Sequence, residues 1–290
     1  MPGWLCSFEG IISGVTMARK NYHCSETTFE RWIKEGRGEG RNREYKPWIT
    51  VRDLASMGRS HRVFGHKSQR THHLFSDLEL AVFLILEWHI DTVEIREQFP
   101  LQRHVTLKLA EKAGIKHPSD KGVMQYLSSD FLVNSSNPTY PKFVLQAKYT
   151  DALADPRTIE KLELERRYWK EKGVPWLMVT EKEIQATVFE NIEWLYPIQG
   201  DEFDPEKLVD LATFYSKQFD KYPNHTLIEI GKKIDAAYEQ DLGEALLDIR
   251  VLLARRCFMF DLYIPIRKLV AKDLNISNIS VLAEASRVQN

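Results

Sequence analysis

Long hydrophobic runs are missing from this 290-residue sequence. The longest strongly apolar run, Leu80 to Leu86, is far shorter than the ~20 residues that a membrane-spanning helix needs. The N-terminus also lacks a basic segment followed by an apolar stretch and a cleavage site. We therefore expect a soluble protein that is neither inserted in a membrane nor exported.

Cysteine is scarce as well. The three cysteines, Cys6, Cys24 and Cys257, have no paired spacing and no histidine at a ligand interval. This pattern argues against a disulfide framework and against a structural zinc site. A reducing, cytoplasmic location fits this composition best.

Neither sign of charge is in excess, because Lys+Arg 40 against Asp+Glu 41 leaves a formal charge of −1. This balance excludes a histone-like basic protein and an acidic disordered chain. The charge is nevertheless uneven: residues 1–70 hold 13 Lys/Arg and 7 Asp/Glu, net +6, and the remaining 220 hold 27 and 34, net −7. The two halves are expected to meet different partners.

The first two thirds of the chain predict a small mixed sheet flanked by helices, complete near residue 181. Apolar spacing and turn signals indicate a buried helix, three strands, a second helix and a fourth strand. In order, these are Leu74–Trp88, Thr92–Glu97, Asp130–Asn134, Phe143–Tyr149, Pro156–Lys172 and Pro175–Thr180. The fold class is thus α/β, followed by a mostly α region.

The last third predicts helices followed by a hairpin, which suggests a winged-helix-like module. The helical segments are Glu183–Leu195, Pro205–Phe219, Thr226–Gln240 and Gly243–Arg255, and the strands are Cys257–Tyr263 and Ile276–Leu282. We expect residues 1–16 to be a dispensable, disordered extension, because they show no helical or strand period. The predicted domains are then 17–181, catalytic, and 182–290, for docking a partner.

The chemistry is expected at Asp130, at the head of one strand, and at Gln146, Ala147 and Lys148 on the next. Period two places Gln146 and Lys148 on one face, with the Ala147 carbonyl between them. Oxygen ligands beside an ammonium suit Mg²⁺-dependent phosphodiester cleavage, with Mn²⁺ a plausible substitute. Glu79 is the candidate third acid, since a carboxylate in an apolar helix is costly unless it faces a polar site.

Each of these residues also has an ordinary structural interpretation. Lys148 could be a surface lysine at a strand end, and Glu79 could be a capped or salt-bridged helix acid. Only the joint pattern, within this order of helices and strands, favours a nuclease.

A basic segment precedes the sheet. Ser25–Lys34 predicts a capped helix, and Gly36–Arg43 predicts a flexible basic loop. The loop could be a solvated linker or an arm that contacts phosphates. The candidate DNA contacts are Arg37, Arg41, Arg43, Lys46, Arg59, His61, Arg62 and His73.

From about Phe29 to the C-terminus the sequence resembles the TnsA family, the endonuclease subunits of heteromeric cut-and-paste transposases. The stretches that carry the resemblance are Ile33–Gly38, Pro47–Val51, Gly58–Arg62, His72–Leu84, Asp91–Leu101, Gly114–Pro118, Leu162–Trp169 and Glu190–Tyr196. The resemblance implies a restriction-endonuclease-like N-terminal domain and a winged-helix-like C-terminal domain. By this resemblance, Glu79, Asp130, Gln146 and Lys148 correspond to the family's catalytic and metal-binding positions. With the Ala147 carbonyl from the strand pattern, the expected Mg²⁺ ligands are Glu79, Asp130, Gln146 and Ala147.

The resemblance further implies cleavage of transposon-end DNA near its 5′ ends. A separate DDE-type transposase subunit, TnsB, would cut and join the 3′ ends, and the C-terminal domain would dock on the AAA+ regulator TnsC. Two alternatives stay open. One is a stand-alone restriction-type or junction-resolving nuclease, and the other is a non-catalytic winged-helix regulator that contacts DNA through Arg255, Arg256, Arg267 and Lys268.

Overall fold

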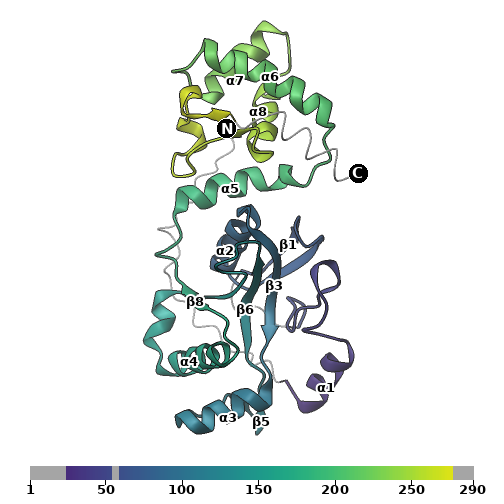
Figure 1. Cartoon of the computed structure of the whole chain (residues 1–290), viewed down its shortest axis with the longest axis vertical. Coiled ribbons are helices and arrows are strands. Elements are labelled where there is room, and N and C mark those ends of the chain that lie inside the picture. Colours follow the sequence, from purple (N-terminus) through teal and green to yellow (C-terminus); the bar gives the residue numbers. More distant parts are fainter. Residues whose placement is uncertain (1–23, 54–58, 277–290) are drawn as a thin grey trace.

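The computed structural model describes residues 24–53 and 59–276. The predicted extension 1–16 lies outside these residues. Figure 1 shows an elongated molecule with the sheet toward one end, a bundle of helices at the other, and one helix, α5, between them. Among the helices of the described ranges, none is both long and apolar enough to cross a membrane.

The sheet-bearing part contains four helices and eight strands among the described residues. They are α1 (Glu26–Lys34), β1 (His61–Gly65), β2 (Arg70–Leu74), α2 (Asp77–Trp88), β3 (Thr92–Pro100), α3 (Arg103–Ala113), β4 (Ser119–Asp120), β5 (Val123–Met124), β6 (Ser128–Ser135), β7 (Lys142–Ala147), α4 (Pro156–Glu171) and β8 (Trp176–Val179).

The central sheet has the strand order β3-β6-β7-β8. The pairs β3–β6 and β6–β7 are antiparallel, and β7–β8 is parallel because α4 carries the chain back across the sheet. The four predicted strands, the buried α2 and the long α4 are therefore confirmed, with ends shifted by a few residues. The mixed α/β class of this part is confirmed with them.

Two features of this part were not predicted. Residues 61–74 form the antiparallel hairpin β1–β2, and the polar stretch between β3 and β6 contains α3 and the short hairpin β4–β5. Only Thr106, Leu109 and Ala110 of α3 are buried, so its apolar stripe is too narrow to stand out in the sequence. In β1 and β2, basic and histidine side chains obscure the strand alternation.

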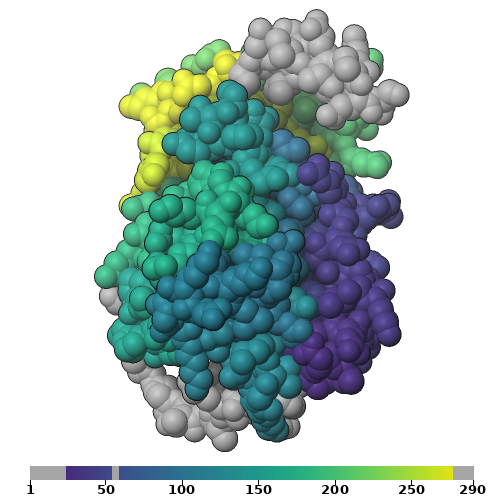
Figure 2. Space-filling view, turned by 60° about the horizontal axis from the view of Figure 1, so that its bottom comes forward, coloured from purple at the N-terminus to yellow at the C-terminus, as the bar shows by residue number. Residues whose placement is uncertain are grey.

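The N-terminal segment lies along one side of the sheet-bearing part, where Figure 2 shows it in purple. An aromatic cluster of Phe29, Trp32, Trp48 and Tyr126 fastens it there. The basic loop after α1 closes on itself, with the Gly38 N–H donating to the Lys46 carbonyl (2.6 Å). The loop is therefore packed against the fold rather than extended away from it.

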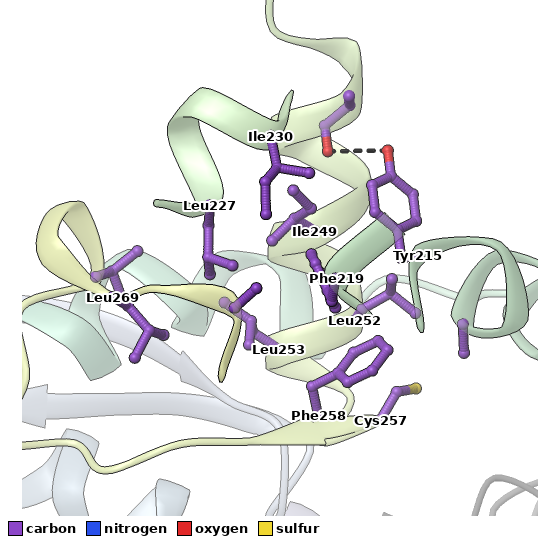
Figure 3. Close-up of a cluster of buried hydrophobic side chains, with 14 of the residues drawn as sticks. Tyr215, Phe219, Leu227, Ile230, Ile249, Leu252, Leu253, Cys257, Phe258 and Leu269 are labelled. Atoms are coloured by element: carbon purple, nitrogen blue, oxygen red, sulfur yellow. Dashed lines mark hydrogen bonds between the residues drawn. The ribbon is translucent and has the colours of Figure 1, made fainter. Parts of the chain in front are cut away.

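The C-terminal part is mostly helical. Its elements are α5 (Ala186–Gln199), α6 (Pro205–Lys221), α7 (Leu227–Ala237), α8 (Glu244–Ala254), β9 (Phe258–Met259) and β10 (Asn275–Ile276). Figure 3 shows the buried cluster between these helices, which includes Leu227, Leu252 and Phe258. The Tyr215 hydroxyl donates to the Ala245 carbonyl (3.1 Å), and the dashed line in Figure 3 marks this bond.

The four predicted C-terminal helices are confirmed, but the predicted hairpin is much shorter. β9 and β10 pair antiparallel over two residues each, with Phe258 opposite Ile276. The predicted strand 257–263 ends after Met259, because the Tyr263 N–H donates to Asp261 Oδ1 (2.9 Å) and turns the chain. Most of the predicted partner strand, 277–282, lies outside the described residues.

Helix α5 contacts both parts. Its Ile192 and Tyr196 belong to the core around α2, and its Leu195 belongs to the C-terminal core. Tyr196 also donates from its hydroxyl to the Phe64 carbonyl of β1 (2.5 Å). The helix that opens the C-terminal part is thus also a layer of the sheet-bearing part.

Candidate active site

The two central strands, β6 and β7, separate at Asp130 and Gln146. There, the side chain of each residue accepts a hydrogen bond from a backbone N–H of the other strand. The described pairing of β6 with β7 ends at Phe131 and Leu145. Next to it, the Asp130 backbone N–H donates to Gln146 Oε1 (2.9 Å), and the Ala147 N–H donates to Asp130 Oδ2 (2.9 Å). Asp130 and Gln146 are both buried, so the separating strands leave carboxylate and amide oxygens inside the fold.

Glu79 joins this cluster from the first turn of α2. The Ser76 hydroxyl accepts the Glu79 N–H (3.0 Å), and Glu79 Oε2 accepts the Phe75 N–H (3.0 Å). Burial, followed by the nearby Asp130 carboxylate, raises the pKa of Glu79 to about 8. Helix capping thus holds the carboxyl group inside the fold, where burial and the neighbouring carboxylate favour its protonated form.

Lys148 directly follows β7. Its Nζ lies 3.4 Å from Asp130 Oδ2 and 3.0 Å from the Ala147 carbonyl oxygen. Burial by itself would lower the pKa of the ammonium, but the carboxyl groups of Asp130, Glu79 and Glu165 outweigh burial and raise that pKa. Lys148 therefore stays a cation, which suits it to offset phosphate charge rather than to take up a proton.

Two buried residues that the sequence analysis did not single out border the cluster. The amide nitrogen of Gln98, on β3, lies 3.5 Å from Asp130 Oδ1. Glu165, on α4, accepts from the hydroxyl of Ser129 (2.7 Å) and from the indole N–H of Trp176 (2.9 Å). Burial is the main cause that raises the pKa of Glu165 to about 8. An acid in a long polar helix carries no sequence signal of this burial, and Gln98 carries none at all.

The oxygen atoms of the cluster are suitable ligands for a hard divalent cation, although only two acidic side chains contribute them. Within residues 24–53 and 59–276, no three His, Cys, Asp or Glu side chains are grouped as they would be around a metal ion. The donors on hand are instead two carboxyl groups, Glu79 and Asp130, with the Gln146 amide oxygen and the Ala147 carbonyl oxygen. Mg²⁺ accepts such oxygens and keeps several waters, so the residues present fit it.

The structure divides the predicted DNA contacts into two groups. Four have their polar atoms engaged within the protein. Arg37 binds Asp53 (2.6 Å) and stacks on Trp32, with only 14% of its side chain exposed. In the same group, Lys46 donates to the Glu35 carbonyl, His61 binds Asp77, and His73 Nδ1 accepts the Val51 N–H.

The other four, Arg41, Arg43, Arg59 and Arg62, are exposed. Arg62 belongs to β1. The Arg59 guanidinium lies 3.8 Å from the carboxylate of Asp77, and Asp77 is two residues before Glu79 in α2. Exposed arginine is therefore present near the helix end that carries Glu79. The structure brings together all four predicted catalytic residues and Ala147, but only part of the predicted basic set.

A mixed sheet with two acids, an amide and a lysine where its central strands separate places the protein in the class of metal-dependent nucleases. A family model described as "TnsA-like endonuclease N terminal" matches residues 89–181, and one described as "TnsA endonuclease C terminal" matches residues 183–262. The chain is 45% identical over 274 residues to "Transposon Tn7 transposition protein TnsA" of Escherichia coli, covering 94% of this chain and 100% of that protein. The chain belongs to the TnsA family, and it is an endonuclease of that family.

The resemblance inferred from sequence motifs is thus confirmed. Asp130, Gln146 and Lys148 fall within the first matched range, and Glu79 precedes that range. A purely regulatory, non-catalytic role does not agree with the match to endonuclease models over both parts of the chain.

Proposed function

We propose that the protein is the Mg²⁺-dependent DNA endonuclease of a transposase complex and cleaves at the 5′ ends of a transposon during cut-and-paste transposition. The observation that carries this proposal is the convergence of Glu79, Asp130 and Lys148 where two central strands separate. The relative's printed name ties that protein to Tn7 transposition, and 45% identity over its full length supports the same process here.

In the proposed site, Asp130 and Glu79 would hold a divalent cation together with the Gln146 and Ala147 oxygens. When bound, the cation would supply a Lewis acid for phosphodiester cleavage. The Lys148 ammonium, 3.4 Å from Asp130, offsets negative charge that develops on the phosphate and orients the attacking water. Mg²⁺ is the proposed ion because the donors are all oxygens, and Mn²⁺ is expected to substitute.

Arg37, Lys46, His61 and His73, whose polar atoms are engaged within the protein, are proposed to have structural roles at the protein surface. The four exposed arginines are proposed to hold the DNA backbone. Arg41 and Arg43 flank Asn42, whose N–H donates to Glu94 Oε1 (2.9 Å), so the loop that bears them is fixed to β3. A guanidinium on a fixed support loses less freedom when it binds a phosphate. Arg59 and Arg62 would continue this contact toward Glu79.

The C-terminal part is proposed to be a winged-helix-like domain, from about residue 182, that docks on TnsC, while TnsB cuts and joins the 3′ ends. Its support is the confirmed order of four helices followed by a short hairpin. We further propose that the enzyme acts in the cytoplasm. The free, buried thiols of Cys24 and Cys257 suit a reducing compartment.

A stand-alone nuclease is the second candidate, because it would need the same four residues. The two candidates differ in their need for partners. Cleavage of transposon-end DNA in Mg²⁺, measured with and without the transposase subunit, separates them. Cleavage that depends on the transposase subunit supports the proposed role in a transposase complex. Equal cleavage without the subunit supports a stand-alone nuclease.

A further inference from the structure

Gln98 has an unusual backbone conformation for a buried strand residue. Six non-glycine residues in the described ranges have a positive φ, and Gln98, with φ +48°, is the buried one that lies within a strand. The others are Asn42, Gln69, Lys121, Glu239 and Arg256. A left-handed backbone is unfavourable for a residue with a side chain, so the surrounding structure must enforce it.

Hydrogen bonds on both sides of Gln98 supply this enforcement. The Trp48 N–H donates to the Gln98 carbonyl (3.2 Å), and the Tyr45 hydroxyl donates to the Glu97 carbonyl (3.1 Å). The Glu97 side chain is itself fixed by Arg70, whose guanidinium donates to Glu97 Oε1 (2.8 Å). The backbone of β3 is thus anchored at this position by the N-terminal segment and by β2.

The side chain of Gln98 lies between the two proposed acidic ligands. Its Nε2 is 3.4 Å from Glu79 Oε2 and 3.5 Å from Asp130 Oδ1. Its Oε1 accepts the Ser128 hydroxyl (3.2 Å), which directs the amide nitrogen toward the carboxyl groups. Glu79 comes from α2 and Asp130 from β6, so one amide links two elements of the site.

We propose that Gln98 is a positioning residue of the metal site, whose amide holds the Glu79 and Asp130 carboxyl groups at the separation that a divalent cation requires. The inference rests on the proposed function, because it needs these two groups to be metal ligands. When both groups are ionised to bind the cation, the two carboxylates repel each other, and a donor shared between them opposes this repulsion. Partners that hydrogen-bond to metal ligands commonly change metal affinity by about 10- to 100-fold when they are removed.

The test replaces Gln98 in the full chain and measures Mn²⁺ affinity directly. Gln98→Met keeps the length and bulk of the side chain but removes its donors. Gln69→Met is the matched control, because Gln69 is a glutamine with φ +53° in the β1–β2 turn, and its amide donates to the His66 carbonyl (2.7 Å). Free Mn²⁺ is followed by electron paramagnetic resonance, and thermal unfolding reports whether each variant is folded.

We expect Gln98→Met to weaken Mn²⁺ binding by about 10- to 100-fold, and Gln69→Met to leave it unchanged. Ser128→Ala, which leaves Gln98 intact but removes the group that directs its amide, should weaken binding by a smaller factor. If Gln98→Met does not fold, Ser128→Ala decides by the same criterion. Binding as tight as or tighter than that of the parent overturns the inference.

Asp130→Ala separates this inference from the proposed function. Lost Mn²⁺ binding in Asp130→Ala with unchanged binding in Gln98→Met would remove only the role of Gln98. Unchanged binding in Asp130→Ala, or a parent chain that binds no Mn²⁺, would remove the proposed metal site and the inference with it.

Discussion

At the proposed active site, Asp130 and Gln146 each form a hydrogen bond with the strand that carries the other. The Asp130 backbone N–H donates to the Gln146 side chain, and the Asp130 side chain accepts the N–H of Ala147, the next residue of β7. Gln146 therefore has a structural role, as the acceptor for the Asp130 N–H, in addition to its proposed role as a neutral metal ligand. The Gln146 oxygen already accepts one hydrogen bond, and a carbonyl oxygen has a second lone pair for a cation.

Substitution of Gln146 should separate the structural role from the proposed metal-binding role. Gln146→Glu keeps an acceptor for the Asp130 N–H and adds a charge, so it should bind Mg²⁺ at least as well as the parent. Gln146→Ala leaves that buried N–H without its partner, which should cost about 1–3 kcal/mol of stability, and it should need more Mg²⁺ for cleavage. Denaturant unfolding and a Mg²⁺ titration of cleavage measure the two effects. An alanine variant with the parent's stability and metal dependence would contradict both.

Glu165 should make the stability of the protein depend on pH. Its pKa is raised to about 8 in the folded state, chiefly by burial, against an unfolded value of 4.5. Folding therefore favours the protonated form, and this contribution is complete below pH 4.5 and is lost as the pH rises toward 8. The loss should reach a few kcal/mol at about 1.4 kcal/mol per pKa unit.

Glu165→Gln provides the comparison, because the amide oxygen can still accept from Ser129 and Trp176. Urea unfolding of the parent and of the variant between pH 5 and 8 should show a smaller decline in the variant. The pKa of Glu79 is also raised, but Glu79 is present in both proteins, so the difference between their profiles should isolate Glu165. Parallel pH profiles would mean that Glu165 is ionised in the fold.

Arg62→Ala should weaken DNA binding without changing the fold. Arg62 is exposed on β1, and the loss of one phosphate contact should reduce the slope of log affinity against log salt by about 1. Arg31→Ala is the matched control, because Arg31 is an exposed arginine of α1 that lies 3.6 Å from Glu35. Fluorescence anisotropy at several salt concentrations gives both slopes, and equal slopes would show that β1 does not face DNA.

The strands that carry the site could be predicted because each is a short apolar run bounded by polar turns, and Glu79 was conspicuous as an acid in an apolar helix. Arg37 was misleading, since its partner Asp53 is distant in the chain and no local pattern announces the pairing. Gln98 could not be found, because its placement depends on a φ angle that only the packing of other segments imposes. Features that depend on a local stretch of sequence could thus be predicted, whereas contacts between segments far apart in the chain could not.

The position of α5 predicts where the catalytic part can be cut. A fragment that ends at Glu181 lacks Ile192 and Tyr196, which are buried against the α2 core. It should be less stable than a fragment that ends at Gln199 by about 3 kcal/mol or more, at about 1.5–3 kcal/mol for each buried side chain. Denaturant unfolding of the two fragments measures this difference. Equal stability would show that α5 belongs to the C-terminal part alone.

Cleavage of transposon-end DNA by Lys148→Ala and Asp130→Ala, in Mg²⁺ and with the transposase subunit present, tests the central claim most directly. Each variant should lose about 10²- to 10³-fold or more in the rate of 5′-end cleavage, because each removes a charge that acts at the phosphate or its metal ion. Lys142→Ala, at the opposite end of β7, should cleave like the parent. Cleavage at the parent's rate by Lys148→Ala or by Asp130→Ala would contradict the assignment of the active site.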